Sequence, residues 1–141
     1  MISTPPRILL LSLDELFARD LAQQIGDLFS VRMAGSPTAA FAEISESPPW
    51  GLAADLRNVQ EGGHSEVRFL EQLREQYPHV QTIVITDEHP PEPIQRHIAC
   101  GGLLHLKGAV DAQELAKLIA VMSDANGESP VSMLDTSAEE T

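Results

Sequence analysis

The length, composition and charge of the chain set the first limits on its function. Its 141 residues leave room for one domain, so we expect a stand-alone module without a fused output domain. The formal net charge of −12 would repel nucleic-acid phosphates and anionic lipid, and we expect neither nucleic acid nor a membrane as a partner. An apolar run near the start is interrupted by Asp14 and is too short to cross a bilayer, which predicts a cytoplasmic protein.

Five apolar stretches alternate with segments of helical periodicity along residues 7–122. The predicted strands, of which the second is the weakest, are Ile8–Leu11, Ser30–Ala34, Gly51–Ala54, Thr82–Ile85 and Leu103–Leu106. Because these runs are continuous, both faces of each strand should be buried, as in a parallel sheet covered by helices. Right-handed crossovers then place helices on both faces. We therefore predict an α/β fold with a doubly wound five-stranded parallel sheet, flavodoxin-like, in strand order 2-1-3-4-5.

The intervening segments carry apolar stripes and capping signals of helices. Core-facing spacing is found in two sets of residues, namely Phe17, Leu21, Ile25 and Leu28, and Leu115, Leu118, Ile119 and Met122. Ser36 followed by Pro37 predicts the start of one helix, and Asp111 with Glu114 predicts a capping box at another. These signals place helices between the predicted strands and after the last one.

The last segment of the chain differs from the rest in composition. Residues 123–141 are small and polar, with five acidic residues and no Lys or Arg. Such a segment cannot bury enough apolar surface to offset the entropy lost on folding. We therefore divide the chain into a domain over 1–122 and an acidic tail over 123–141, which we expect to be disordered.

The cysteine and histidine residues predict neither a disulfide nor a zinc site. Cys100 is the single cysteine, and we interpret it as a small packing residue. The five histidines lie at no ligand spacing and are interpreted as solvated or packing residues: His64, His79, His89, His97 and His105. The P-loop and G-x-G-x-x-G patterns of phosphate binding are also absent from the sequence.

Functional residues of a doubly wound sheet lie where its strands end, because the crevice forms outside the carboxyl ends of the strands. Here those ends carry Asp55, Thr86 and Lys107. A carboxylate can act as a nucleophile, while a hydroxyl and an ammonium group can neutralise incoming phosphoryl oxygens. Each residue alone is a common structural one, but the three together predict an anion or phosphoryl site.

The order of these motifs resembles the receiver domain of two-component response regulators. The similar stretches are LLSLDELFARDL for the first strand and helix, LAADLRNVQEGG for the phosphoacceptor loop, IVITDE for the fourth strand and ACGGLLHLKG for the fifth. The resemblance implies Asp55 as the phosphoacceptor, with Thr86 and Lys107 beside it. It further implies Mg²⁺ as cofactor, a histidine kinase or a downstream effector as protein partner, and a signalling role that is not enzymatic.

The metal site of that family is incomplete in this chain. The family binds Mg²⁺ with two adjacent acids after the first strand, the phosphoacceptor and a main-chain carbonyl two residues later. Ser12 and Leu13 stand where the two acids belong, and Asp14 follows one residue too late. The remaining candidate ligands are Asp14, Asp55 and the backbone carbonyl of Arg57, and we expect them to bind Mg²⁺ poorly.

Four further positions depart from the family pattern. Val59 replaces a proline of the phosphoacceptor loop, and Asp87 replaces a small residue after the hydroxyl residue. Leu104 replaces the aromatic switch residue, and Gly108 replaces the proline after the lysine. A leucine has no hydroxyl to reorient, and glycine loosens a loop that proline would stiffen.

The sequence leaves three functions open. The first is a receiver-like module that acts through protein–protein interaction, with weak or absent phosphorylation and with the fourth and fifth predicted helices as docking face, also for a homodimer. In that reading we predict a metal-free ion pair between Asp55 and Lys107, with Thr86 in the same hydrogen-bonded cluster. The second is an active phosphorelay receiver phosphorylated on Asp55 by a histidine kinase. The third, a small flavodoxin-like ligand-binding protein or enzyme, lacks a phosphate loop after the first strand.

Overall fold

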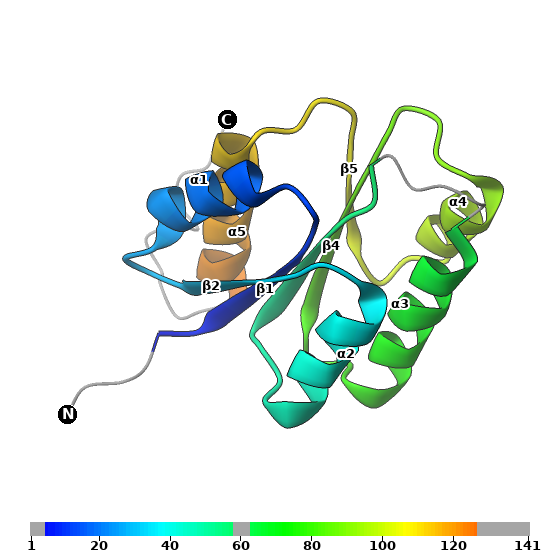
Figure 1. Cartoon of the computed structure of the whole chain (residues 1–141), viewed down its shortest axis with the longest axis horizontal. Coiled ribbons are helices and arrows are strands. Elements are labelled where there is room, and N and C mark those ends of the chain that lie inside the picture. Colours follow the sequence, from blue (N-terminus) through cyan, green and yellow to red (C-terminus); the bar gives the residue numbers. More distant parts are fainter. Residues whose placement is uncertain (1–4, 58–62, 127–141) are drawn as a thin grey trace.

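A single parallel sheet forms the centre of the molecule (Figure 1). The computed structural model describes residues 5–57 and 63–126, with side chains described as far as Ser123. The strands are β1 (Arg7–Leu11), β2 (Ser30–Ala34), β3 (Gly51–Asp55), β4 (Gln81–Thr86) and β5 (Leu104–Lys107). All neighbouring strands are parallel, in the order β2-β1-β3-β4-β5. The predicted fold class and strand order are therefore confirmed.

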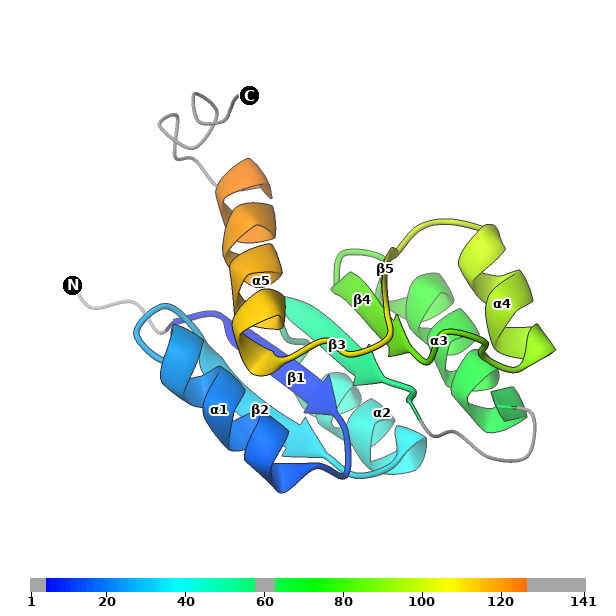
Figure 2. The ribbon, with the colours of Figure 1, turned by 90° about the horizontal axis from the view of Figure 1, so that it is seen from above.

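Helices cover both faces of this sheet (Figure 2). They are α1 (Glu15–Ile25), α2 (Pro37–Glu46), α3 (His64–Gln76), α4 (Glu92–Ala99) and α5 (Ala112–Asn126). Helices α1 and α5 pack together on one face, and α2, α3 and α4 lie on the other. Within the described residues, no helix is long and apolar enough to cross a membrane.

The two faces of the sheet have separate hydrophobic cores. Along β1, Ile8 and Leu10 belong to the core beneath α1 and α5, whereas Leu9 and Leu11 belong to the core beneath α2, α3 and α4. All four side chains are at most 5% exposed. Successive side chains of a strand point to opposite faces, so an uninterrupted apolar run fills both cores.

The helix starts follow the capping signals of the sequence. Ser36 Oγ accepts a hydrogen bond of 3.1 Å from the backbone N–H of Ala39, and Pro37 is the first residue of α2. At α5, the backbone N–H of Glu114 donates to Asp111 Oδ1 at 2.9 Å, and that of Asp111 donates to Glu114 Oε1 at 3.1 Å. Both predicted caps are confirmed, the second as a reciprocal capping box.

Two predicted features differ at the ends of helices. Leu28 is 60% exposed because α1 ends at Ile25 and the chain turns, so that Phe29, 2% exposed, fills the core instead. Helix α5 continues past Met122 to Asn126, and the first residues of the predicted tail are therefore helical. The rest of that tail, 127–141, and Val59 lie outside the described residues.

Candidate functional site

The candidate site lies at the carboxyl edge of the sheet, where β1, β3, β4 and β5 end. Asp55 is the last residue of β3, and Thr86 and Lys107 are paired in register at the ends of β4 and β5. A broad hollow opens at this edge and is lined by residues that include Ser12, Asp55, Arg57, Asp87 and Gly108. The parallel sheet thus brings the predicted site residues to one edge, as strand direction requires.

Asp55 is held by the side chain of Arg57. Arg57 Nε donates to Asp55 Oδ1 at 2.8 Å, and Nη2 donates to Oδ2 at 3.1 Å. The pair is mostly shielded from solvent, because the Asp55 side chain is 9% exposed and that of Arg57 is 18% exposed. Two parallel bonds between a guanidinium and a carboxylate combine charge with a fixed geometry, and such pairs are among the stronger interactions in proteins.

Further donors complete the hydrogen bonding of the Asp55 carboxylate. Ser12 Oγ lies 3.2 Å from Oδ2, and the backbone N–H of Arg57 donates to Oδ1 at 3.2 Å. Ser12 is itself 5% exposed and accepts a bond of 3.0 Å from the backbone N–H of Asp14. Each carboxylate oxygen therefore accepts two bonds from within the chain, and its charge is compensated without an external ligand.

The guanidinium of Arg57 also reaches across the site. Its Nη1 donates to the carbonyl of Val110 at 2.8 Å and to that of Gly108 at 3.4 Å. Hydrogen bonding to Asp55 is the main cause that raises the pKa of Arg57, and the charges of Asp55, Asp14 and Asp87 raise it further, although burial lowers it. Arg57 is thus a permanent cation at the centre of an acidic site.

Thr86 makes a different set of contacts from the predicted one. The side chain is fully buried, and its Oγ1 donates to the carbonyl of Asp87 at 2.9 Å and lies 2.7 Å from His105 Nε2. With the hydroxyl hydrogen on the carbonyl, the contact with His105 requires a hydrogen on Nε2. Burial, followed by the charge of Lys107, lowers the pKa of His105. His105, interpreted from the sequence as a solvated or packing residue, therefore has a specific polar partner.

The predicted ion pair between Asp55 and Lys107 is wrong. Lys107 is exposed, and the ion pair of Asp55 in the described structure is with Arg57. Lys107 belongs to β5, and β4 lies between β5 and β3, whereas Arg57 follows Asp55 by two residues and can fold back onto it. The predicted cluster of Asp55, Thr86 and Lys107 is accordingly replaced by Ser12, Asp55 and Arg57.

The contacts made by the side chains of Ser12, Arg57 and His105 were not predicted from the sequence. Only the backbone carbonyl of Arg57 was considered, as a ligand of Mg²⁺. A cationic side chain two residues after an acid at a strand end can, however, reach that acid. His105 precedes Lys107 by two residues in β5, so the two side chains leave the strand on the same face. These spacings were visible in the sequence, but the choice among neighbouring partners depends on side-chain geometry.

The residues at this edge do not fit a divalent cation in the observed arrangement. The guanidinium of Arg57 bonds to both oxygens of Asp55 and places a positive charge beside the carboxylate that would ligate the metal ion. Asp14 Oδ1 accepts a bond of 3.0 Å from the backbone N–H of Phe17 and thereby caps α1. Among the residues that the structure describes, no group of three or more Asp, Glu, His or Cys side chains could hold a metal ion.

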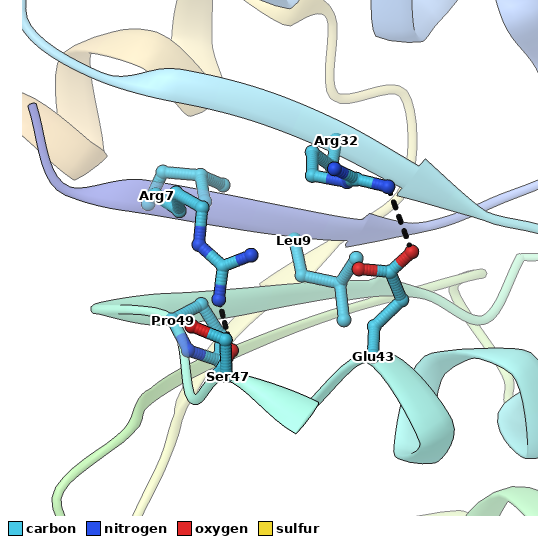
Figure 3. A pocket seen from close by; sticks show the side chains of 7 residues that line it. Arg7, Leu9, Arg32, Glu43, Ser47 and Pro49 are labelled. Carbon is cyan, nitrogen blue, oxygen red and sulfur yellow. Dashed lines mark hydrogen bonds and ion pairs between the residues drawn. The ribbon is translucent and has the colours of Figure 1, made fainter. Parts of the chain in front are cut away.

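A second, small hollow lies between β1, β2 and α2 (Figure 3). Its volume of about 10 Å³ is comparable to the space that one water molecule needs. Both arginines at its rim have partners, since Arg32 pairs with Glu43 at 3.0 Å and Arg7 donates to the carbonyl of Ser47 (Figure 3). This hollow therefore offers little to a ligand, and the crevice at Asp55 is the better candidate site.

Many solved structures of similar shape are response regulators or their receiver domains. No family model and no curated protein matches the chain. The receiver domain of Francisella response regulator 1452 has a TM-score of 0.67 at 15% identity, over 86% of this chain and 99% of that one. A response regulator from Thermotoga maritima has a TM-score of 0.65 at 14% identity, over 83% and 96%. A DNA-binding response regulator of the LuxR family from Staphylococcus aureus has 0.64 at 13%, over 82% and 96%.

The strand order and the position of the crevice define the class of the molecule as a doubly wound, flavodoxin-like α/β protein. Within that class, the chain has the receiver fold of response regulators, as its motifs predicted. At this level of identity the likeness establishes the fold, and the chemistry of Asp55 follows from the contacts of this chain alone.

Proposed function

We propose that this chain is a receiver-like signalling module that acts through protein–protein interaction and does not depend on phosphorylation of Asp55. The receiver fold supports the signalling role. The observation that carries the rest is the double hydrogen bond from Arg57 to the Asp55 carboxylate. In this proposal the domain is not an enzyme, and no Mg²⁺ is bound in its resting state.

The contacts of Asp55 oppose its use as a phosphoacceptor. An attacking oxygen must leave its hydrogen-bond donors, and hydrogen bonds to charged groups contribute about 1.5 to 3 kcal/mol each. The acyl phosphate that would form also needs cations near its oxygens. Lys107 is exposed and outside hydrogen-bonding distance of Asp55, and the adjoining positions Ser12 and Leu13 supply no carboxylate for a metal.

Exposed apolar side chains support protein partners as the ligands of this domain. Large apolar residues that remain exposed in the described structure include Leu104 on β5, 41% exposed, and Val121 on α5, 63% exposed. Strand β5 lies between α4 and α5 in the chain, and these two helices are the docking face that we expect from the sequence. We propose that a protein partner, or a second copy of the chain, binds there.

Phosphorylation of the full chain by a small phosphodonor tests the proposal. The protein is incubated with acetyl phosphate and Mg²⁺, and its intact mass is measured beside an Asp55→Asn control. We expect no addition that depends on Asp55. A saturable addition that the Asp55→Asn variant lacks would instead establish an active phosphorelay receiver.

Fluorescence of Trp50 is not a suitable reporter of this reaction. Trp50 precedes β3 and packs on Phe29 with 5.2 Å between ring centroids. Asp55 is at the other end of β3, and five residues of strand span about 16 Å. The intact mass is therefore the more direct readout of this reaction.

A further inference from the structure

The side chain of Arg57 connects two segments that are distant in the sequence. Its Nε and Nη2 bond to the carboxylate at the end of β3, and its Nη1 bonds to the carbonyl of Val110 between β5 and α5. The guanidinium carbon also lies 5.1 Å from the centroid of the Phe17 ring, which comes from α1. One planar cation thus touches three elements at the carboxyl edge of the sheet.

The charge around Arg57 is the charge that a metal ion would otherwise neutralise. Asp55, Asp14 and Asp87 line the same hollow as Arg57, and the charges of all three raise its pKa. Asp55 contributes most, through its hydrogen bonds. Arg57 thus brings a positive charge, covalently attached to the chain, into a hollow lined by these carboxylates.

Besides the bonds from Arg57, the segment between β5 and α5 is held by the capping box at Asp111, by two backbone bonds and by the burial of Val110. The backbone N–H of Gly108 donates to the carbonyl of Thr86 at 2.7 Å, and that of Val110 donates to Gly108 at 2.9 Å. Gly108 has a φ of 86°, in the left-handed region that favours glycine. Val110 is 9% exposed and belongs to the core beneath α1 and α5. The bonds from Arg57 hold the carbonyls of this turn toward β3.

We propose that Arg57 is a built-in cation that takes the place of a divalent metal ion in this crevice and, as a positioning residue, holds the β5–α5 loop (108–111) in one conformation. This role of Arg57 rests on the proposed function in one respect, because it requires that Asp55 is an unphosphorylated anion. The loop is then fixed by Asp55 and Arg57 together, without a metal ion and without Lys107.

Backbone amide exchange of the full chain tests the positioning role. Exchange at 108–111 is measured by NMR in the unaltered protein, in Arg57→Met, in Asp55→Asn and in the double variant. We expect each single change to speed exchange about tenfold, which corresponds to about 1.4 kcal/mol of local opening. The double variant should exchange no faster than either single one, because the two residues act as one unit.

Two further variants make the result specific. Lys107→Met is the matched control, since it removes a neighbouring exposed cation and should leave exchange at 108–111 unchanged. Arg57→Lys keeps the charge but lacks the planar fork, and it should behave like Arg57→Met. Slow exchange of the Leu10 amide in β1 shows in each case that the variant is folded. Unchanged loop exchange in Arg57→Met, or additive effects in the double variant, would overturn the positioning role.

Titration with Mn²⁺ tests the replacement of a metal ion. Selective broadening of amide signals around Asp55 is expected in Arg57→Met, where the Asp55 carboxylate loses its bonded cation and can accept a metal ion, and not in the unaltered protein. Broadening in the unaltered protein, or none in Arg57→Met, would refute the replacement. Neither measurement uses a phosphodonor. Phosphorylation of Asp55 in the mass experiment would therefore contradict the proposed function, whereas the exchange and Mn²⁺ experiments test the role of Arg57 independently.

Discussion

His105 and Thr86 are joined by a contact of 2.7 Å between Nε2 and Oγ1, across the neighbouring strands β5 and β4. The hydroxyl is fully buried and keeps a second bond to the carbonyl of Asp87. Thr86 occupies the position that the receiver pattern assigns to the phosphoryl site. In this chain it contacts His105, which is not part of that pattern.

Replacing His105 by Phe should lower the free energy of unfolding by about 0.5 to 1.5 kcal/mol, because a buried hydroxyl loses one of two partners. Urea denaturation of the variant measures this difference. Thr86→Val completes a double-mutant cycle, and the two effects should be less than additive. Strict additivity would show that the contact contributes nothing to stability.

Asp55→Asn should lower the free energy of unfolding by about 1 to 3 kcal/mol, because Arg57 loses its charged partner in a shielded pair. Lys107→Met, at an exposed position, should change it by less than about 0.5 kcal/mol. Both are measured by urea denaturation in metal-free buffer. A more stable Asp55→Asn variant would mean that repulsion among the acids outweighs the pair with Arg57.

Stability should fall as the pH decreases through the range in which histidine titrates. Burial, followed by the charge of Arg74, lowers the pKa of His97, although Glu71 acts in the opposite direction. The unfolded chain then binds more protons than the folded one below a pH of about 6.5. The contribution of neutral His97 to the free energy of unfolding is therefore complete above that pH and is lost below it. Urea denaturation at several pH values should show a smaller slope for His97→Leu, and an unchanged slope would contradict the assignment.

Truncation after Asn126 should leave the melting temperature nearly unchanged, because residues 127–141 lack the apolar periodicity of a packed helix. Truncation after Met122 also removes the end of α5 and should lower it by a few degrees. Thermal unfolding followed by circular dichroism compares the two. A large loss on the shorter truncation would mean that the acidic segment packs on the domain.

Much of the fold was predictable because buried strands and helix faces require apolar residues at regular positions in the sequence. Continuous apolar runs such as Ile8–Leu11 predict strands buried on both faces, and the caps at Ser36 and Asp111 predict helix starts from single hydrogen bonds. Leu28 was misplaced because helical periodicity does not reveal where a helix ends. In that case the turn after Ile25, rather than the spacing, decides which side chain is buried.

The candidate site was predictable in place but not in its contacts. Strand direction brings Asp55, Thr86 and Lys107 to one edge whatever their neighbours are. Which cation bonds to Asp55 depends on the reach and shape of the competing side chains, and Arg57 offers a fork close by in the chain. The family pattern includes a lysine at the position of Lys107 but no arginine at the position of Arg57, so it predicts the wrong partner for Asp55.

The alternation of two cores along β1 makes this strand intolerant of changes in length. Inserting one residue before Leu9 would shift the strand by one position, so that side chains now beneath α1 and α5 would face α2 and α3. Apolar character would be kept on both faces, yet the shapes would no longer match their helices. Length variation among proteins with this sequence pattern should therefore be confined to the connections between elements, and the spacing from Arg7 to Ser12 should stay constant.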